Sequence, residues 1–166
     1  MTGLLDDYLV DPKLSLLDKT KIQAQVLVPV LGALRAELGK ERADGLVRQA
    51  LRDWSRRLFT SVADGVAGSP RRKWKAIQDV FGEISGKEVE FAILRHDPEA
   101  LDIDVTHCRF AEFFRALGEP ELGTLLICAA DFDIAAAGDG EVGLERAQTI
   151  MQGAPSCTFR YRFAPR

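Results

Sequence analysis

The stretch "KEVEFAILRHDPEALDIDVTHC", residues 87–108, decides the fold class, because the chain changes here from helical to strand periodicity. Apolar and polar residues alternate on both sides of Asp97-Pro98-Glu99, which predicts two strands joined by a hairpin turn. The residues predicted to share one face are Val89, Phe91 and Ile93 in the first strand and Leu101, Ile103, Val105 and His107 in the second.

The part of the chain before this hairpin is predicted to be helical. The helices expected from apolar spacing span residues 14–38, 41–64 and 71–84. Pro29 should kink the first helix or start it afresh, because proline has no N–H to donate. Gly39 should end that helix. Residues 1–12 are predicted to form a lead-in arm.

The part after the hairpin is predicted to return to helix and then to strand. Helices are expected over residues 109–118 and 121–137, and residues 141–150 are expected to pair with 157–163. We therefore predict an α+β fold in which N-terminal helices precede a ββ-αα-ββ unit, whose four-stranded antiparallel sheet is covered by helices. The whole chain, 1–166, is interpreted as one domain with a lead-in arm (1–12), a helical part (13–85) and a site-bearing part (86–166).

The bulk composition argues against some classes of binding partner. The net charge of -3 and the pI of about 5.5 argue against a nucleic-acid binder, whose surface is normally basic. We find no apolar run of about 18 residues and no secretory signal, so no membrane partner is expected. Three cysteines are too few for a disulfide scaffold, which favours free thiols in the cytoplasm. The long amphipathic N-terminal helices are compatible with a homodimer.

Arg146 occupies an unusual place in the predicted last hairpin. Counting by twos from Val142 puts Arg146 and Gln148 on the same face as Leu144 and Ile150. Two interpretations stay open for Arg146: an ion pair with a carboxylate of a covering helix, or a bidentate contact with the carboxylate of a small anionic ligand. If the period is shifted by one residue, Glu145 and Thr149 become the inward pair.

Three cysteines and two titratable neighbours form the candidate site. Cys108, beside His107, lies where a strand enters a helix, and free N–H groups at a helix N-terminus stabilise a thiolate. Cys128 and Asp131 are three residues apart in a helix and share one stripe. Cys157 begins the apolar face of the last strand.

Convergence of Cys108, Cys128 and Cys157 would permit two kinds of chemistry. The three sulfurs, with His107, Asp131 or water as fourth ligand, would suit Zn²⁺ or another divalent metal. Alternatively, one thiolate attacks an electrophilic carbon while His107 or Asp131 moves protons, with no cofactor. Three unrelated structural cysteines are the third interpretation.

These residues also carry a family resemblance. The segment from Val105 to Phe163 resembles the L-2-amino-thiazoline-4-carboxylic acid hydrolase family in five motifs. The matching positions are Cys108, "LGEPELG" (117–123), Cys128 with Asp131, Arg146 with Thr149, and Gly153 with Cys157, Phe159 and Arg160. Ala154 and Thr158 stand where the family often has acidic residues.

The resemblance implies a hydrolase that opens the C=N-containing ring of a small amino-thiazoline or a related heterocyclic amino acid. It implies catalysis by Cys108, Cys157, Asp131 and His107, and an anionic substrate held by Arg146, Gln148 and Thr149. The final hairpin is also similar to that of the vinyl-4-reductase-type domains, which implies a small-molecule or metal-binding module without turnover. A tailoring enzyme of the same fold that acts on another heterocycle is the intermediate hypothesis.

Overall fold

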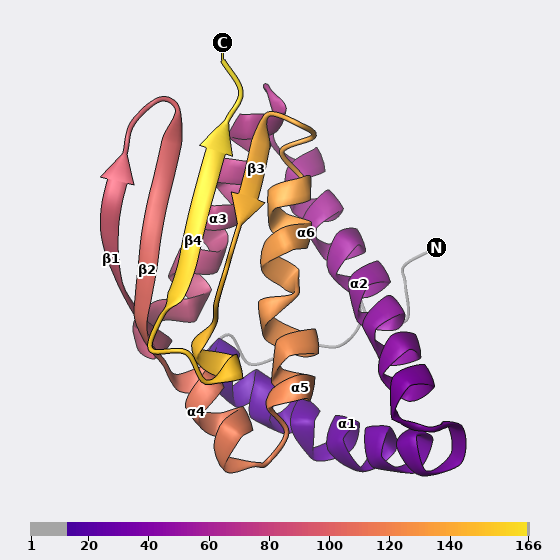
Figure 1. Cartoon of the computed structure of the whole chain (residues 1–166). Helices are drawn as coiled ribbons and strands as arrows, with labels where there is room; N and C mark the ends of the chain where they lie inside the picture. The colour runs from indigo at the N-terminus through magenta and orange to yellow at the C-terminus, as the bar shows by residue number, and fades with distance from the viewer. Residues whose placement is uncertain (1–12, 166) are drawn as a thin grey trace.

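The computed structural model describes residues 13–165, so the predicted lead-in arm lies outside the described residues. Three long helices come first (Figure 1): α1 (Leu16–Leu38), α2 (Lys40–Asp64) and α3 (Pro70–Ser85). Ser15 caps α1 by accepting a hydrogen bond from the Asp18 N–H. Gly39 ends α1 with a positive φ of 79°, as predicted, whereas α1 continues through Pro29.

The four strands form one antiparallel sheet, which confirms the predicted α+β fold. The strands are β1 (Val89–His96), β2 (Ala100–Cys108), β3 (Val142–Glu145) and β4 (Cys157–Phe163). Their order across the sheet is β1-β2-β4-β3, and every neighbouring pair is antiparallel. A short 3₁₀ helix, η1 (Gly86–Glu88), leads from α3 into β1. Both hairpins named from the sequence are therefore present, and β2 and β4 lie at the centre.

The helical segment between the hairpins differs from the prediction in one respect. After α4 (Arg109–Ala116), the expected continuous helix is divided into α5 (Pro120–Gly123), the π-helix η2 (Thr124–Cys128) and α6 (Ala130–Ala136). The Ala129 N–H donates to the carbonyl oxygen of Thr124, five residues back, at 2.8 Å. Side-chain periodicity carries no mark of this wider turn, which is why the sequence predicted an uninterrupted helix.

The last hairpin is shorter than predicted, because β3 ends at Glu145. The chain then runs irregularly to a 3₁₀ turn, η3 (Ile150–Gln152), before β4. Thr149 starts that turn: its hydroxyl accepts a hydrogen bond from the Gln152 N–H at 3.2 Å. A side chain that caps a turn competes with the strand ladder, so residues 146–150 leave the strand.

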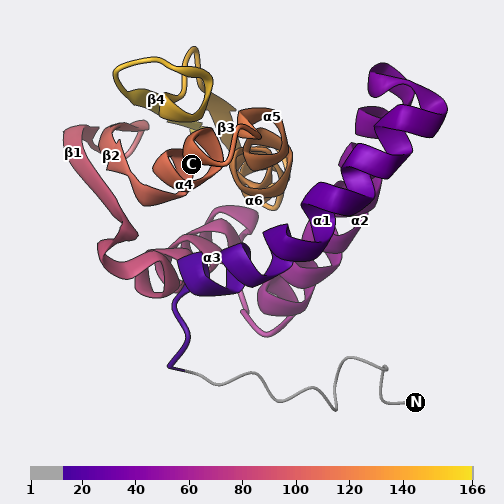
Figure 2. The ribbon, with the colours of Figure 1, turned by 90° about the horizontal axis from the view of Figure 1, so that it is seen from below.

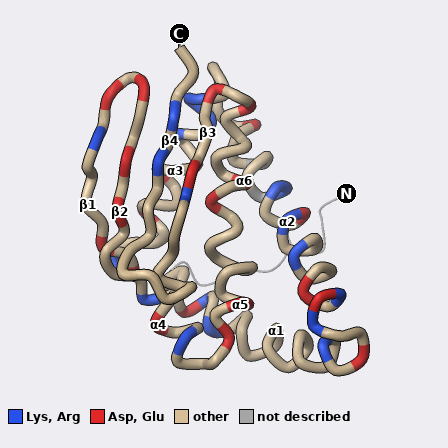
Figure 3. Tube along the Cα trace, viewed as in Figure 1, with Lys and Arg blue, Asp and Glu red and all other residues tan. Residues whose placement is uncertain are grey.

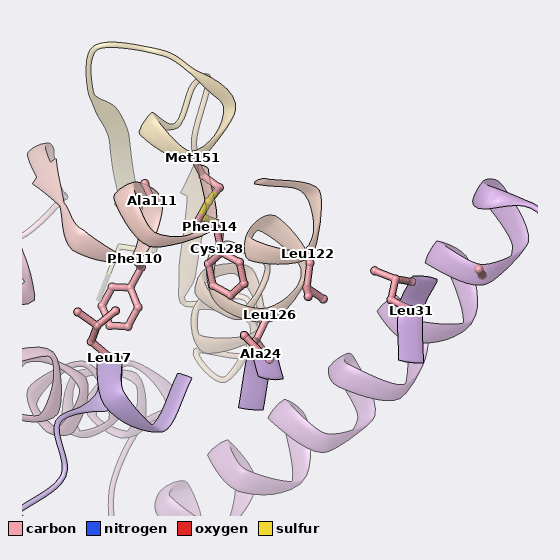
Figure 4. Close-up of a cluster of buried hydrophobic side chains, with 11 residues drawn as sticks. Leu17, Ala24, Leu31, Phe110, Ala111, Phe114, Leu122, Leu126, Cys128 and Met151 are labelled. Carbon is pink, nitrogen blue, oxygen red and sulfur yellow. The ribbon is translucent and has the colours of Figure 1, made fainter. Parts of the chain in front are cut away.

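The helices cover one face of the sheet and form two hydrophobic clusters (Figures 1 and 2). One cluster joins α1 to α4, α5, η2 and η3 through Phe110, Phe114, Leu122, Cys128 and Met151, among others (Figure 4). The other packs α2, α3 and α6 on the sheet and includes Phe59, Trp74, Ile77, Ile134 and Tyr161. No helix among residues 13–165 is long and apolar enough to cross a membrane.

The helices leave the β1 edge uncovered. Phe91 and Ile93, predicted to lie on the covered face, are 58% and 54% exposed. Alternation in a sequence predicts which residues share a face, but it does not predict which strand lies at the edge of the sheet.

Candidate functional site

The three cysteines lie at one end of the sheet. Cys108 ends β2 and precedes α4, Cys128 ends the π-helix, and Cys157 begins β4. Because β2 and β4 are antiparallel and Val105 pairs with Cys157, the end of β2 lies beside the start of β4. The sulfurs are within electrostatic range of one another, since negative charge on either Cys108 or Cys157 raises the pKa of the Cys128 thiol.

Arg146 and Asp131 form an ion pair beside these cysteines. Nη1 of Arg146 donates a hydrogen bond to Oδ2 of Asp131, and the two side chains are 6% and 29% exposed. The guanidinium carbon lies 4.8 Å from the ring centre of Phe132 and 5.4 Å from that of Phe159. A guanidinium held between two rings and a carboxylate has a fixed orientation. The covering-helix carboxylate expected from the sequence is therefore Asp131 itself.

Asp131 has a carboxyl that is readily protonated near neutral pH. Burial raises its pKa to about 6, and the charge of Arg146 and the hydrogen bond from it act in the opposite direction. A carboxyl in this range exists in both protonation states under ordinary conditions. That property is what general acid–base catalysis requires.

Burial raises the pKa of all three thiols. The backbone N–H groups of Ala111 and Phe110 lower the pKa of Cys108 and so partly offset the effect of burial. The Ile150 N–H, which donates to Sγ of Cys157 at 3.2 Å, has the same effect on the pKa of Cys157. Cys128 and Cys157 are 7% exposed, while Cys108 is half-buried. At neutral pH the sulfurs are therefore thiols, and a base must remove the proton before one of them can attack.

His107 lies apart from this group. A β-bulge shifts the register so that Glu90 pairs with His107 and Phe91 with Val105. The prediction that His107 shares a face with Val105 was therefore wrong, since a bulge breaks strand alternation. Its Nε2 lies 2.7 Å from Oε1 of Glu112, and the side chain is 40% exposed.

Two further predicted substrate-binding residues make local contacts. Nε2 of Gln148 donates to the carbonyl oxygen of Ser156 at 3.2 Å and to its Oγ at 3.1 Å. Thr149 is buried at 3% exposure, and its hydroxyl donates to Oε1 of Gln152 at 3.0 Å. These contacts hold the loop between β3 and β4, and a role for either residue toward substrate stays a prediction.

Two residues near the ion pair, Tyr161 and Phe132, were not predicted from the sequence. The buried Tyr161 hydroxyl accepts a hydrogen bond from Nε2 of Gln78 at 2.9 Å. Burial raises the pKa of Tyr161, and the charge of Asp131 adds to this rise. Tyr161 shares a strand face with Cys157, so the alternation could have indicated it. No sequence pattern indicated Phe132, because its ring is part of the site only through its contact with Arg146 in the folded protein.

The metal interpretation finds no set of ligands in the described part of the chain. Within residues 13–165, no three side chains of His, Cys, Asp or Glu are grouped so that they could hold a metal ion. Binding of zinc or another divalent metal stays a prediction.

A hollow of about 500 Å³ is bounded by α2, α4, α5, the π-helix and η3, and its lining residues do not include Arg146, Asp131 or a cysteine. The lining residues include Lys40, Arg48, Arg115, Leu125 and Met151. Met151 also packs in the hydrophobic cluster that contains Phe114 and Cys128, and Figure 4 shows these three side chains together. Met151 therefore belongs both to the wall of the hollow and to the cluster that contains Cys128.

The fold and this site define a class of α+β proteins with a partly buried Arg–Asp pair beside several thiols. The model of the L-2-amino-thiazoline-4-carboxylic acid hydrolase family matches residues 19–161, and the chain belongs to this family. No curated protein matches the chain significantly. Among solved structures, the phenol-responsive sensory domain of the transcription activator PoxR with phenol is similar at 16% identity and a TM-score of 0.47, covering 82% of this chain and 72% of that chain.

Proposed function

We propose that this protein is a hydrolase that opens the ring of a small amino-thiazoline carboxylate or a related heterocyclic amino acid. The observation that carries the proposal is the Arg146–Asp131 pair, which lies beside three thiols in a member of this family. The pair offers a fixed cation and a carboxyl that titrates near neutral pH. Both are needed to hold and hydrolyse an anionic substrate.

Arg146 is the proposed anchor for the substrate carboxylate. A guanidinium has five N–H donors in a planar fork, and the bond from Nη1 to Asp131 uses one edge of it. The remaining donors suit a second carboxylate in bidentate geometry. The rings of Phe132 and Phe159 hold the fork in place, so little rotamer entropy is lost when the substrate binds.

Asp131 is the proposed acid–base residue, and Cys108 is the proposed nucleophile. Cys108 is the most accessible of the three thiols, and two backbone N–H groups favour its thiolate. As Sγ bonds to the ring carbon between nitrogen and sulfur, Asp131 accepts the thiol proton. The proton then goes to the ring atom that leaves. Water cleaves the adduct in a second step, which releases a carbamoyl-cysteine type of product and restores the thiol.

One observation favours a second function, the binding of a small molecule without turnover. All three thiols have raised pKa values, and two of them are buried. Inert thiols of this kind commonly serve as packing residues. In that case Arg146 and the rings of Phe132 and Phe159 would hold a ligand without turnover. A tailoring enzyme that acts on a different heterocycle would use the same residues for catalysis.

The discriminating experiment measures ring opening of L-2-amino-thiazoline-4-carboxylic acid by mass spectrometry of the carbamoyl product. Asp131→Asn should abolish turnover, while Asp104→Asn should retain it. Asp104 is a matched control, because it is 28% exposed and paired with Arg160 at 2.7 Å, but it lies on the opposite face of the sheet.

The same assay distinguishes the hydrolase from the small-molecule-binding module. Stabilisation of the protein by the substrate without product would support the binding module. Full activity of Asp131→Asn would reject the proposed mechanism. An absence of both product and stabilisation would reject this substrate, and a panel of related heterocyclic carboxylates would then test the tailoring hypothesis.

A further inference from the structure

The middle of helix α1 (Leu16–Leu38) presents an outer face without charge. Residues 22–34 contain no charged side chain, although only one side of the helix is packed against the protein, through Leu17, Thr20, Ala24 and Leu31. On the other side Ile22, Val26 and Val30 are 53%, 64% and 47% exposed. Apolar residues at i, i+4 and i+8 form one continuous stripe along a helix.

The described part of the chain leaves this stripe open. Figure 2, seen from below, shows α1 in the foreground with no helix or strand of residues 13–165 lying over it. Figure 3 shows the middle of α1 as tan, without blue or red. An exposed apolar stripe bounded by polar residues is typical of a protein–protein interface.

The charges at the two ends of the stripe are opposite in sign. Lys19 lies one turn before Ile22, and Glu37 lies one turn after Ala33. At 100° per residue both project from the same side of α1 as Val26. They are five helical turns apart, about 27 Å along the axis. Neither side chain has an ion-pair partner among residues 13–165.

The outer face of α1 carries a cation at one end, an apolar stripe in the middle and an anion at the other end. Such a face is complementary to itself when two copies of the helix are antiparallel. With the two-fold axis near residue 28, Lys19 of each copy lies opposite Glu37 of the other. In the same register, Val26 of each copy packs against Val30 of the other. Identical patches related by a two-fold axis are the rule for homodimers.

We propose that the outer face of α1 is a dimer interface on which a second copy of this chain packs its own α1 in antiparallel orientation. One pair of helices buries an area at the low end of the range for specific interfaces, about 1,200 Å² or less. The dimer should therefore dissociate on dilution. This proposal does not depend on the proposed enzymatic activity.

Sedimentation equilibrium of the full chain over a wide concentration range tests the interface. Val26→Glu should raise the dimer dissociation constant about tenfold or more, because it places two carboxylates at the centre of an apolar contact. The matched control is Leu94→Glu on β1, where the leucine is 59% exposed, and it should leave the constant unchanged. Circular dichroism should show both variants folded, since both positions are on the surface.

Charge reversal tests the orientation. Lys19→Glu and Glu37→Lys should each weaken the dimer several-fold, and the double variant K19E/E37K should restore it. A chain that is monomeric at every concentration would overturn the proposal. So would a dimer that Leu94→Glu disrupts and Val26→Glu does not, because β1 would then be the interface. Failure of the double variant to restore the dimer would overturn the antiparallel arrangement.

Discussion

The Arg146 guanidinium donates to the Asp131 carboxylate across the gap between the end of β3 and helix α6, and it does so while 6% exposed. Burial therefore raises the pKa of Asp131, while attraction to Arg146 lowers it. Burial is the larger effect, because the carboxyl pKa rises to about 6 in spite of its cationic partner. Removal of the carboxylate should therefore change how the stability of the protein depends on pH, and removal of the guanidinium should change the pKa of Asp131.

Asp131→Asn should change the pH dependence of stability. The pKa of Asp131 is about 6 in the folded protein and about 3.9 in an unfolded chain. The folded state therefore binds more protons between these values, and stability contributed by this group falls as pH rises from about 4 to about 6. Asparagine resembles the neutral acid, so the variant should gain stability relative to the natural protein across this window. Urea unfolding at several pH values measures the difference.

Asp104→Asn provides the control series for that measurement. A difference between the Asp131→Asn variant and the natural protein that stays constant from pH 4 to pH 7 would contradict a raised pKa. A difference of opposite sign would mean that the ion pair outweighs burial.

Arg146→Met should raise the pKa of Asp131 above 6. The charge of Arg146 and its hydrogen bond are what lower this pKa, and methionine fills a similar volume without either. Carbon-detected NMR titration of the Asp131 carboxyl gives the value directly. Arg160→Met, on the other face of the sheet, should leave the titration unchanged. A fall in the Asp131 pKa on loss of Arg146 would refute the proposed cause.

Alkylation should modify Cys108 before Cys128 and Cys157. Cys108 is half-buried, whereas the other two are 7% exposed. Because burial raises the pKa of Cys108, its rate at pH 7 should still be lower than that of a free cysteine, and should increase with pH. Iodoacetamide labelling and then peptide mass mapping measure the order. Faster modification of Cys157 than of Cys108 would contradict the order of accessibility.

Gly123→Ala should destabilise the protein by about 1–3 kcal/mol. A Cβ at position 123 would lie 2.6 Å from Sδ of Met151 and 2.6 Å from Cγ of Phe114, so α5 would have to move away from η3. The matched control is Gly82→Ala in α3, where a Cβ meets nothing within 4 Å. That change should stabilise the helix by about 0.5–1 kcal/mol. Urea unfolding of both variants decides between these outcomes, and equal effects would show that α5 is not tightly packed.

Much of the fold could be predicted because it depends on side-chain periodicity. The alternation around Asp97-Pro98-Glu99 predicted the first hairpin, and the strand face of Cys157 was predicted by the same reasoning. The expected convergence of Cys108, Cys128 and Cys157 depended on one compact sheet, and the pairing of Val105 with Cys157 supplies the contact between two of the three segments.

The parts of the fold and of the site that could not be predicted depend on backbone features that side-chain patterns do not encode. The bulge beside Val105 moved His107 to the other face, and the cap formed by Thr149 ended β3 early. The exposure of Phe91 depends on which strand forms the sheet edge. The identity of the Arg146 partner depends on which residue near the start of α6 faces the end of β3, and side-chain spacing does not give this direction.

The π-helix of residues 124–128 lets the length of this segment change without turning the site. A wide turn holds about one residue more than an α-helical turn, so it absorbs the ~100° by which an additional residue would rotate the rest of the helix. Loss of one codon between Gly123 and Cys128 would therefore restore an ordinary helix and leave Asp131 facing Arg146. A comparison based on residue spacing alone would count such a descendant as altered, although its ion pair would be kept.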